Sequence, residues 1–361
     1  MASQGAEPSC SGSHSAGRHI GNGPVPKFQS LTRMSLRFFA AVLGLGLLGY
    51  LVFRSGPEAV WKEVQAVGWG LALVVILGGL CQLIRTWAWR QTITYDIKGL
   101  PWSRSLGAQL ASDACGQLGF AGKLIGEGIH VSLVSPVVPV ARGISACAID
   151  GGMHLLTAAV VAVLGISIAL LHFPLSGQWR VYALVLAAAL IAVVVLAFVA
   201  VASRWRLMGN AARAIARLPQ LHNWMIGKEP FVDAAENNLL AFSRKAPSAF
   251  RASLILSLLW HAVAVLEVYV VLRFMGPGIA LVSAFAMEGL TKVVNLVGAL
   301  NPGNFGTYEG GNMLMANMFG VTATAGLTLA LCRRARGVFW AGVGVICMIV
   351  MKGAAERAKQ K

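Results

Sequence analysis

Residues 293–321 read VVNLVGALNPGNFGTYEGGNMLMANMFGV, and this stretch interrupts long apolar segments with helix-breaking and polar residues. Glycine and proline end a helix and free backbone N–H and C=O groups. In apolar surroundings, such a break is tolerated where protein or a water-filled cavity covers it. Small residues that allow close helix packing would explain some of the glycines. They do not explain Pro302 between two asparagines with Glu309 following.

The composition outside this stretch indicates an integral membrane protein. Hydrophobic residues make up 57% of the 361 residues and charged residues only 12%, against about 25% charged residues in soluble domains. The net charge of +16 comes from Lys and Arg between apolar runs, where they set topology and meet anionic lipid. We therefore expect no nucleic-acid partner. The six cysteines are scattered without a CxxC pair, so we expect no disulfide framework, no metal site and no cofactor.

Apolar runs of about 18 residues or more predict an all-α, polytopic transmembrane bundle of seven or eight crossings. The expected spans are Leu36–Phe53, Trp69–Ile84, Gly143–Leu171, Val181–Ser203, Ala252–Leu272, Gly278–Leu300, Gly310–Cys332 and Gly337–Met351. Residues 1–30 are rich in Ser, Gly and Pro and are expected to form a disordered cytoplasmic tail. The transmembrane domain is expected over 31–352, followed by a basic tail over 353–361.

Charge placement predicts the topology of the first half. Basic residues before the first span put the N-terminus in the cytoplasm, and the basic segments 85–104 and 204–251 are expected there too. Three apolar segments lie between these two loops, and three crossings cannot start and end on one side. We therefore predict a re-entrant hairpin over 105–142, the least apolar of them. In the C-terminal third the basic stretch with Arg333, Arg334 and Arg336 leaves two alternatives open: Gly278–Leu300 spans fully, or it forms a second re-entrant element with the break after it.

Two break motifs resemble each other, one ending in Glu127-Gly128 and the other in Glu309-Gly310. Paired broken helices in two halves are typical of transporters built from inverted repeats. The similarity is short, so an inverted repeat is one alternative and two unrelated breaks are the other.

Free N–H groups at a broken helix attract anions such as a phosphate headgroup, and ionisable residues inside spans are costly unless they function. Cations near the breaks would bind the headgroup, and carboxylates would orient them or relay protons. The candidate substrate-binding residues are Lys123, Glu127, Arg142, Asp150, Lys292, Pro302, Gly303, Gly306 and Glu309.

Further ionisable residues in the apolar segments are Asp113, His154, Glu267 and Glu288. The four-residue spacing predicts that Glu288 pairs with Lys292. Asp150 has two expected partners, His154 on the same helix or Arg142. Glu267 is expected to reach the membrane interface from near the end of a span.

Four sequence features together carry a family resemblance: RTWAWR at 85–90, GFAGKLIGEG at 119–128, ISACAIDGGMHLL at 144–156 and NPGNFGTYEGG at 301–311. The chain resembles the flippase-like transmembrane domain family of lysylphosphatidylglycerol synthase over about residues 35–350, and within it the membrane proteins associated with hopanoid biosynthesis. The family motif Pro-Gly-x-x-Gly-x-x-Glu is supplied in full by Pro302, Gly303, Gly306 and Glu309. The first motif lacks the family's Pro and Arg after Glu127, and no soluble aminoacyl-transferase domain is expected after the last span.

The resemblance and the breaks together favour a lipid flippase or transporter of the inner (cytoplasmic) membrane that binds or moves an anionic or isoprenoid-type lipid headgroup. No GxxxxGK[ST] motif is present, so uphill transport would need an ion gradient or a partner. Two alternatives remain open. One is a membrane-embedded transferase that acts on a lipid carrier with Glu309 or Asp150 as general base. The other is a non-catalytic scaffold that docks lipid-biosynthesis proteins through the basic loop 204–251.

Overall fold

The computed structural model describes residues 57–93, 99–116, 120–172, 177–203, 229–276, 279–298 and 304–359, with the single residues 53, 210 and 301. These residues form helices and no strand. The helices are α2 (Pro57–Val67), α3 (Gly70–Thr92), α4 (Trp102–Gly116), α5 (Phe120–Val134), α6 (Val140–His172), α7 (Gly177–Ser203), α10 (Glu229–Lys245), α11 (Pro247–Met275), α12 (Leu281–Gly298), α13 (Thr307–Met318) and α14 (Ala323–Lys359). The predicted tail over 1–30 and nearly all of the first predicted span lie outside the described residues.

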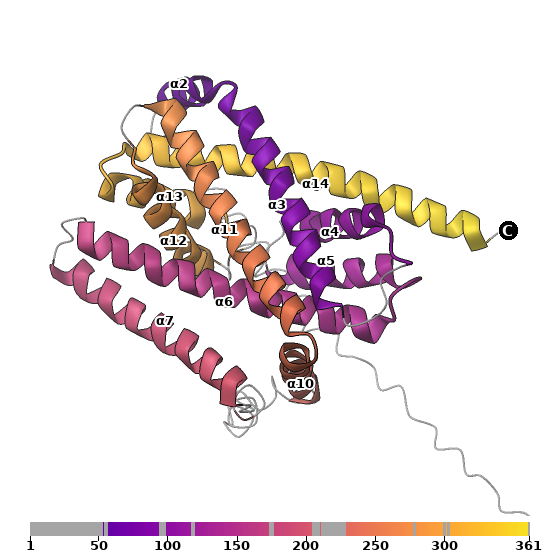
Figure 1. Cartoon of the computed structure of the whole chain (residues 1–361). Coiled ribbons are helices and arrows are strands. Elements are labelled where there is room, and N and C mark those ends of the chain that lie inside the picture. The colour runs from indigo at the N-terminus through magenta and orange to yellow at the C-terminus, as the bar shows by residue number, and fades with distance from the viewer. Residues whose placement is uncertain are drawn as a thin grey trace, which may run out of the picture.

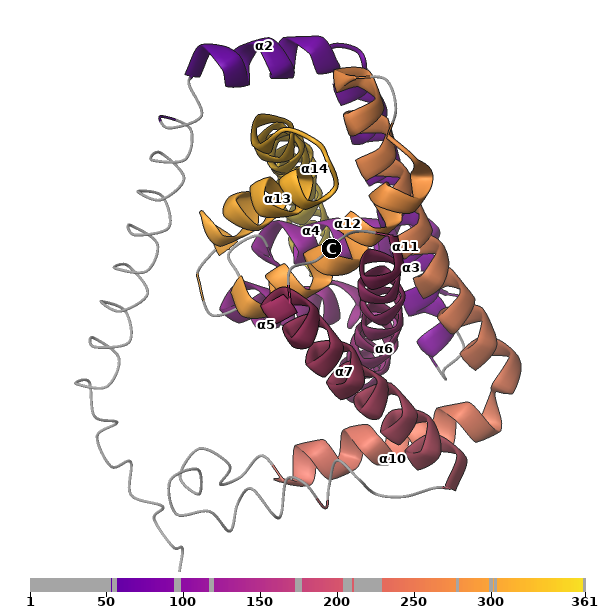
Figure 2. The same ribbon diagram turned by 90° about the vertical axis from the view of Figure 1, so that its left-hand side faces the viewer.

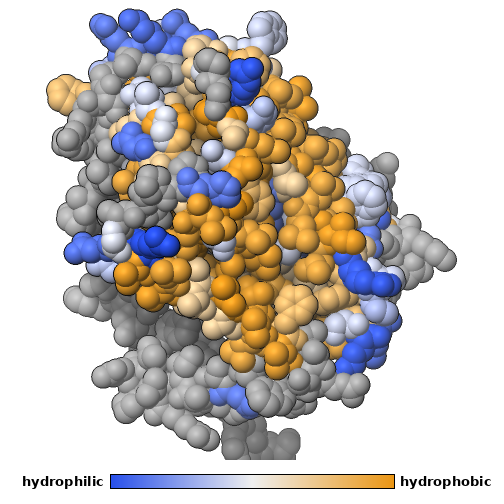
Figure 3. Space-filling model, turned by 60° about the vertical axis from the view of Figure 1, so that its left-hand side comes forward, coloured by the Kyte–Doolittle hydropathy of each residue, from blue (hydrophilic) through white to orange (hydrophobic). Residues whose placement is uncertain are grey.

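Among the described residues, six helices are long and apolar enough to cross a membrane: α3, α6, α7, α11, α12 and α14. The predicted polytopic helical bundle is therefore confirmed. Its surface carries a broad hydrophobic face with hydrophilic residues mainly at the margins (Figure 3). Helix α7 is apolar on all sides and almost unburied in its central window, as expected for a helix that contacts lipid over most of its surface.

Helices α4 and α5 form a helical hairpin. It lies where the odd number of apolar segments between two cytoplasmic loops predicted a re-entrant element. Each has 15 residues, which gives about 22 Å at 1.5 Å per residue, less than the ~30 Å core of a bilayer. They pack closely on each other, and Gly126 of α5 leaves room for the backbone of Ser112. Neither helix is long enough to cross alone.

The structure corrects two predictions of basic loops. Helix α14 is one continuous helix of 37 residues, so a loop at Arg333–Arg336 and separate spans over Gly310–Cys332 and Gly337–Met351 are wrong. Helix α3 likewise continues through Arg85 to Thr92. In both places buried carboxylates from distant helices pair with the arginines, which therefore do not need an aqueous loop.

The bundle consists of two repeats, α2–α6 and α10–α14. Helix α3 packs against α11, α4 against α14, and α12, the counterpart of α4, against α6. Gly70 at the start of α3 lies against Phe274 near the end of α11, so these two equivalent helices are antiparallel (Figure 1). The helices α2 and α10, which precede them, lie across opposite ends of the bundle (Figure 2). The repeat is therefore inverted, as one of the two sequence alternatives predicted, but the Glu127-Gly128 pair lies inside α5 and not at a helix break.

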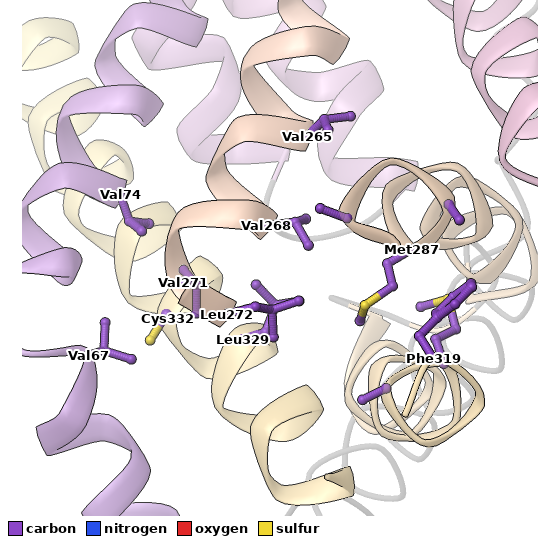
Figure 4. Close-up of a cluster of buried hydrophobic side chains, with 14 of the residues drawn as sticks. Val67, Val74, Val265, Val268, Val271, Leu272, Met287, Phe319, Leu329 and Cys332 are labelled. Carbon is purple, nitrogen blue, oxygen red and sulfur yellow. The ribbon is translucent and has the colours of Figure 1, made fainter. Parts of the chain in front are cut away.

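The largest hydrophobic cluster joins the end of α2 to α3, α11, α12, α13 and α14 (Figure 4). Its labelled members are Val67, Val74, Val265, Val268, Val271, Leu272, Met287, Phe319, Leu329 and Cys332. Burial of this apolar surface fixes the short helix α13 against α12 and α14, which positions the chain break that precedes it.

Candidate functional site

A polar cavity of about 270 Å³ lies between the α4–α5 hairpin and the long helices α3 and α6. Its lining residues come from five helices: Gln82, Arg85, Trp89, Gln109, Ser112, Asp113, Gly116, Lys123, Glu127, His130, Cys147, Asp150, His154 and Trp260. The spacing of these residues along their helices explains why they face the same space. Gln82, Arg85 and Trp89 recur every three or four residues on one face of α3, and Gln109, Ser112, Asp113 and Gly116 do so on α4. Both polar faces point to the same space.

An ion pair between α3 and α6 lines this cavity. The Arg85 Nη2 atom lies 2.9 Å from Asp150 Oδ2, and the Asp150 side chain is only 5% exposed. Asp150 therefore pairs with Arg85, and not with His154 or Arg142 as the sequence predicted. The second carboxylate oxygen, Oδ1, is buried without a hydrogen-bond partner. A buried acceptor without a partner is costly, and a bound ligand or water would satisfy it.

Aromatic rings form the rest of the wall. The Trp89 and His130 rings lie 4.2 Å apart between centroids, and His154 is edge-on to Trp260 at 4.7 Å. Trp89 Nε1 and His130 Nε2 are buried without a partner. Lys123 is the exposed member of the lining, and it lies one helical turn before Glu127 on α5. The cavity therefore offers two cations, three carboxylates and buried polar atoms that lack partners.

A second group of charges is buried in the other repeat, which we call the closed cluster: Glu267 of α11, Glu288 and Lys292 of α12, and Arg333 and Arg336 of α14. Arg333 Nη2 lies 2.8 Å from Glu288 Oε2, and Arg336 Nη1 lies 2.6 Å from Glu267 Oε2. Lys292 pairs with Glu288, as the four-residue spacing predicted. Glu267 is 1% exposed, so its expected position at the interface is wrong.

The chain break before α13 is held by Glu309. This carboxylate is fully buried, accepts the Gly306 N–H at 2.7 Å and pairs with Arg334 of α14. Gly306 has φ of +74° and Asn304 φ of +53°, a conformation that Gly adopts freely and Asn tolerates. Arg334 also donates to the Asn304 carbonyl and lies over the Phe305 ring. These bonds satisfy Glu309 within the protein.

Of the nine candidate residues from the sequence, the seven that the structure describes fall into four places. Lys123, Glu127 and Asp150 line the cavity. Lys292 belongs to the closed cluster but lies 5.0 Å from the Trp260 ring, which lines the cavity. Gly306 and Glu309 are at the break, and Pro302 and Gly303 are outside the described residues. Arg142 is exposed near the start of α6 and is not part of the cavity lining.

Sequence reasoning did not select Arg85, Gln82 or Gln109 for the site, nor Arg333 and its neighbours. The polar stripe on α3, three residues spaced for one helix face, was a usable signal for Arg85. No comparable signal existed for Arg333, because its carboxylate partners Glu267 and Glu288 lie on other helices, distant in sequence.

The sequence model of the family described as the lysylphosphatidylglycerol synthase TM region matches residues 37–344. The chain therefore belongs to this family and is a multi-pass integral membrane protein, which confirms the resemblance to the family; the likeness to hopanoid-associated proteins stays a prediction. Comparisons with curated proteins and with solved structures gave no match.

Proposed function

We propose that the protein is a lipid transporter that binds a polar lipid headgroup in the cavity and moves it between the two leaflets. The observation that carries the proposal is the cavity itself, a charged space with unsatisfied buried polar atoms inside an inverted-repeat membrane bundle. In transporters of this architecture, substrate sites lie near the repeat interface, and Trp260 of the second repeat completes the lining of this cavity of the first repeat. The membership of a lipid-related membrane family supports the same cargo.

The chemistry of the lining favours a headgroup that carries a phosphate together with hydroxyl or amine groups. Arg85 and Lys123 would bind the phosphate oxygens through charge-assisted hydrogen bonds. Glu127 and the second oxygen of Asp150 would accept hydrogen bonds from hydroxyl or amine groups. The acyl chains would remain in the bilayer against the exposed apolar surface of α3, which carries Leu83 and Trp87 opposite the polar face.

We further propose that the protein resides in the inner membrane with its N-terminus in the cytoplasm. Lys27, Arg33 and Arg37 precede the first apolar run, and positive charge next to a span favours the cytoplasmic side.

Purified protein in liposomes tests the transport proposal. The probes are phosphatidylglycerol and phosphatidylethanolamine labelled on an acyl chain with a fluorophore that external dithionite quenches. Protein-free liposomes lose the outer-leaflet half of the signal, and active protein should expose the inner-leaflet half as well. The variant Lys123→Gln should slow this second phase about tenfold or more, because a charged hydrogen bond is worth about 1.5–3 kcal/mol.

The matched control is Arg180→Gln, which removes a cation from the exposed start of α7 and should leave the rate unchanged. Absence of protein-dependent movement for both probes, with correctly folded protein, would refute the proposal. Equal slowing by Lys123→Gln and Arg180→Gln would show that the cavity has no specific role in lipid movement.

A further inference from the structure

Two histidine rings stack on each other in the middle of the bundle. His154 lies near the middle of α6 and lines the cavity, and His261 lies near the middle of α11 and is 1% exposed. Their ring centroids are 4.8 Å apart and their planes differ by 20°. Trp260 meets both rings edge-on. Ionisable side chains at this depth of a membrane are costly and commonly serve ion or proton binding.

The hydrogen bonds of Thr157 fix where His261 can accept a proton. The Thr157 hydroxyl donates its one proton to the main-chain carbonyl of Met153 or of His154, each at 3.0 Å. Its oxygen therefore accepts a hydrogen bond from His261 Nε2, which lies 3.2 Å away. This arrangement leaves a lone pair on His261 Nδ1, an atom that is buried without a hydrogen-bond partner. His154 Nδ1 is buried without a partner as well, so each ring has a nitrogen that makes no hydrogen bond.

The charges of the cavity lining indicate what a proton acceptor would do there. Arg85 and Lys123 carry two positive charges in their ordinary ionised forms, and Asp113, Glu127 and Asp150 carry three negative charges. The lining therefore has a net charge of one negative before any lipid binds. A phosphate headgroup would bring a further negative charge into surroundings of low dielectric constant, where like charges repel strongly. A cation that binds together with the headgroup would remove this excess.

The side chains around the histidine pair do not supply a free cation. The charged and titratable groups that face the two rings from the surrounding helices are Arg85 of α3, Asp113 of α4, Lys123, Glu127 and His130 of α5, Cys147 and Asp150 of α6, Glu288 and Lys292 of α12 and Arg333 of α14. Arg85, Lys292 and Arg333 are all paired with carboxylates. Lys123 has Glu127 one helical turn away. The additional positive charge therefore has to come from solution.

We propose that His154 and His261 form a proton-binding site, and that the protein moves a proton together with an anionic lipid headgroup. The inference rests on the proposed function and names the ion that is coupled to it. The pair takes up one proton, because two charged rings 4.8 Å apart would repel each other. The proton comes from water on the face where the headgroup binds and returns to water on the face where the headgroup leaves.

The coupling follows from binding energies alone. A proton on the pair attracts the phosphate, and by linkage the bound phosphate favours the proton to the same extent. A headgroup with one negative charge then crosses without net transfer of charge, which avoids the cost of an ion in apolar surroundings.

A pH gradient across liposomes tests the coupling. Purified protein is reconstituted with labelled phosphatidylglycerol, an anion, or with labelled phosphatidylethanolamine, whose own ammonium group balances its phosphate. The outside pH is the same in every sample, and the inside is one pH unit more acidic or more alkaline. Once lipid movement has reached a steady state, external dithionite measures the fraction of label in the outer leaflet.

Coupled movement should enrich phosphatidylglycerol in the leaflet that faces the alkaline side. The outer fraction should rise above one half when the inside is acidic and fall below one half when it is alkaline. One proton per lipid limits the ratio between the leaflets to about tenfold per pH unit. Phosphatidylethanolamine should stay evenly distributed. An ionophore that exchanges potassium for protons should abolish the enrichment, and protein-free liposomes give the background over the same time.

Replacement of either histidine by glutamine keeps a polar side chain of similar size but removes the proton acceptor. His154→Gln and His261→Gln should leave phosphatidylglycerol evenly distributed under both gradients. His172→Gln is the matched control, because this histidine is exposed at the end of the same helix α6, and it should keep the enrichment. If His261→Gln fails to fold, Thr157→Val removes the hydroxyl that orients His261 and should at least halve the enrichment.

An even distribution of phosphatidylglycerol under both gradients, with wild-type protein that still moves lipid, would overturn the inference and leave the proposed function intact. Enrichment that survives in both histidine variants would also overturn it, and its loss in Glu127→Gln would then assign the proton to that carboxylate. Equal enrichment of phosphatidylethanolamine would contradict the charge balance on which the inference depends. Absence of any lipid movement by folded wild-type protein would instead refute the proposed function.

Discussion

Removal of the Arg85 side chain should destabilise the protein strongly, and removal of its partner as well should restore much of the loss. Arg85→Gln leaves the Asp150 carboxylate, 5% exposed, without its cation. An uncompensated buried charge costs about 3–5 kcal/mol, and we expect the lower end because Arg85 is 16% exposed at the cavity. In the double variant Arg85→Gln/Asp150→Asn no charge remains, so the loss should fall to about 1 kcal/mol.

The assay is the midpoint of thermal unfolding in detergent, followed by the loss of the monodisperse size-exclusion peak. Unfolding of membrane proteins in detergent is commonly irreversible, so all variants are compared at one heating rate. A loss of about 3 kcal/mol lowers the midpoint by several degrees. Arg180→Gln should stay within about 0.5 kcal/mol of the wild type, as surface substitutions usually do. The restored double variant should still fail to move lipid, because the headgroup cation is missing.

Two results would refute this reasoning. If Arg85→Gln unfolds at the wild-type midpoint, the Asp150 carboxylate does not depend on this pair. If the double variant loses as much as Arg85→Gln and Asp150→Asn measured separately and added, the two side chains do not interact in the folded protein. Stability and lipid movement restored together would show that the pair holds α3 against α6 without binding a headgroup.

Two further predictions concern the helix crossings and the break. Gly289→Val should lower the unfolding midpoint by the equivalent of about 2 kcal/mol or more, because its side chain would meet the backbone of α6; Gly152→Val, where an added Cβ meets nothing within 4 Å, should stay within about 1 kcal/mol. Equal loss in both would contradict the close crossing. Glu309→Gln should cost about 3 kcal/mol, because it leaves the Arg334 guanidinium without its carboxylate at the break. Glu58→Gln on the exposed face of α2 is its control, and equal midpoints for the two would exclude a stabilising role for Glu309.

Apolar length alone was enough to predict the helices that cross as uninterrupted hydrophobic runs. The run over 143–171 became α6, and that over 181–203 became α7. The count of crossings between the basic loops predicted the α4–α5 hairpin, which hydropathy alone does not indicate. These predictions succeeded because each depends on local composition or on counting, and neither requires knowledge of which helices meet.

The errors arose where a charge is neutralised by a residue far away in sequence. Arg333 was assigned to a loop because basic residues gather in the loops between membrane spans. The rule fails here because Glu288 lies within 2.8 Å, a contact that local sequence does not reveal. Arg85 was assigned to a loop for the same reason, and its partner Asp150 lies on a different helix, beyond the α4–α5 hairpin. Of the proposed site, the sequence supplied Lys123, Glu127 and Asp150 and missed Arg85, which pairs with Asp150.

The inverted repeat was hard to recognise in the sequence. Equivalent positions in its two halves both hold polar residues, but the residue types and their charges differ. Gln109 and Asp113 of α4 take the places of Glu288 and Lys292 in its counterpart α12, so the residues at these positions are not identical. This difference also explains why the cavity is in the first repeat. The Gln109 amide does not attract a cation as strongly as the Glu288 carboxylate attracts Arg333. The helices around Gln109 therefore leave a space between them, whereas those around Glu288 are joined by an ion pair. The asymmetry of charge therefore explains which half of the bundle holds the open cavity.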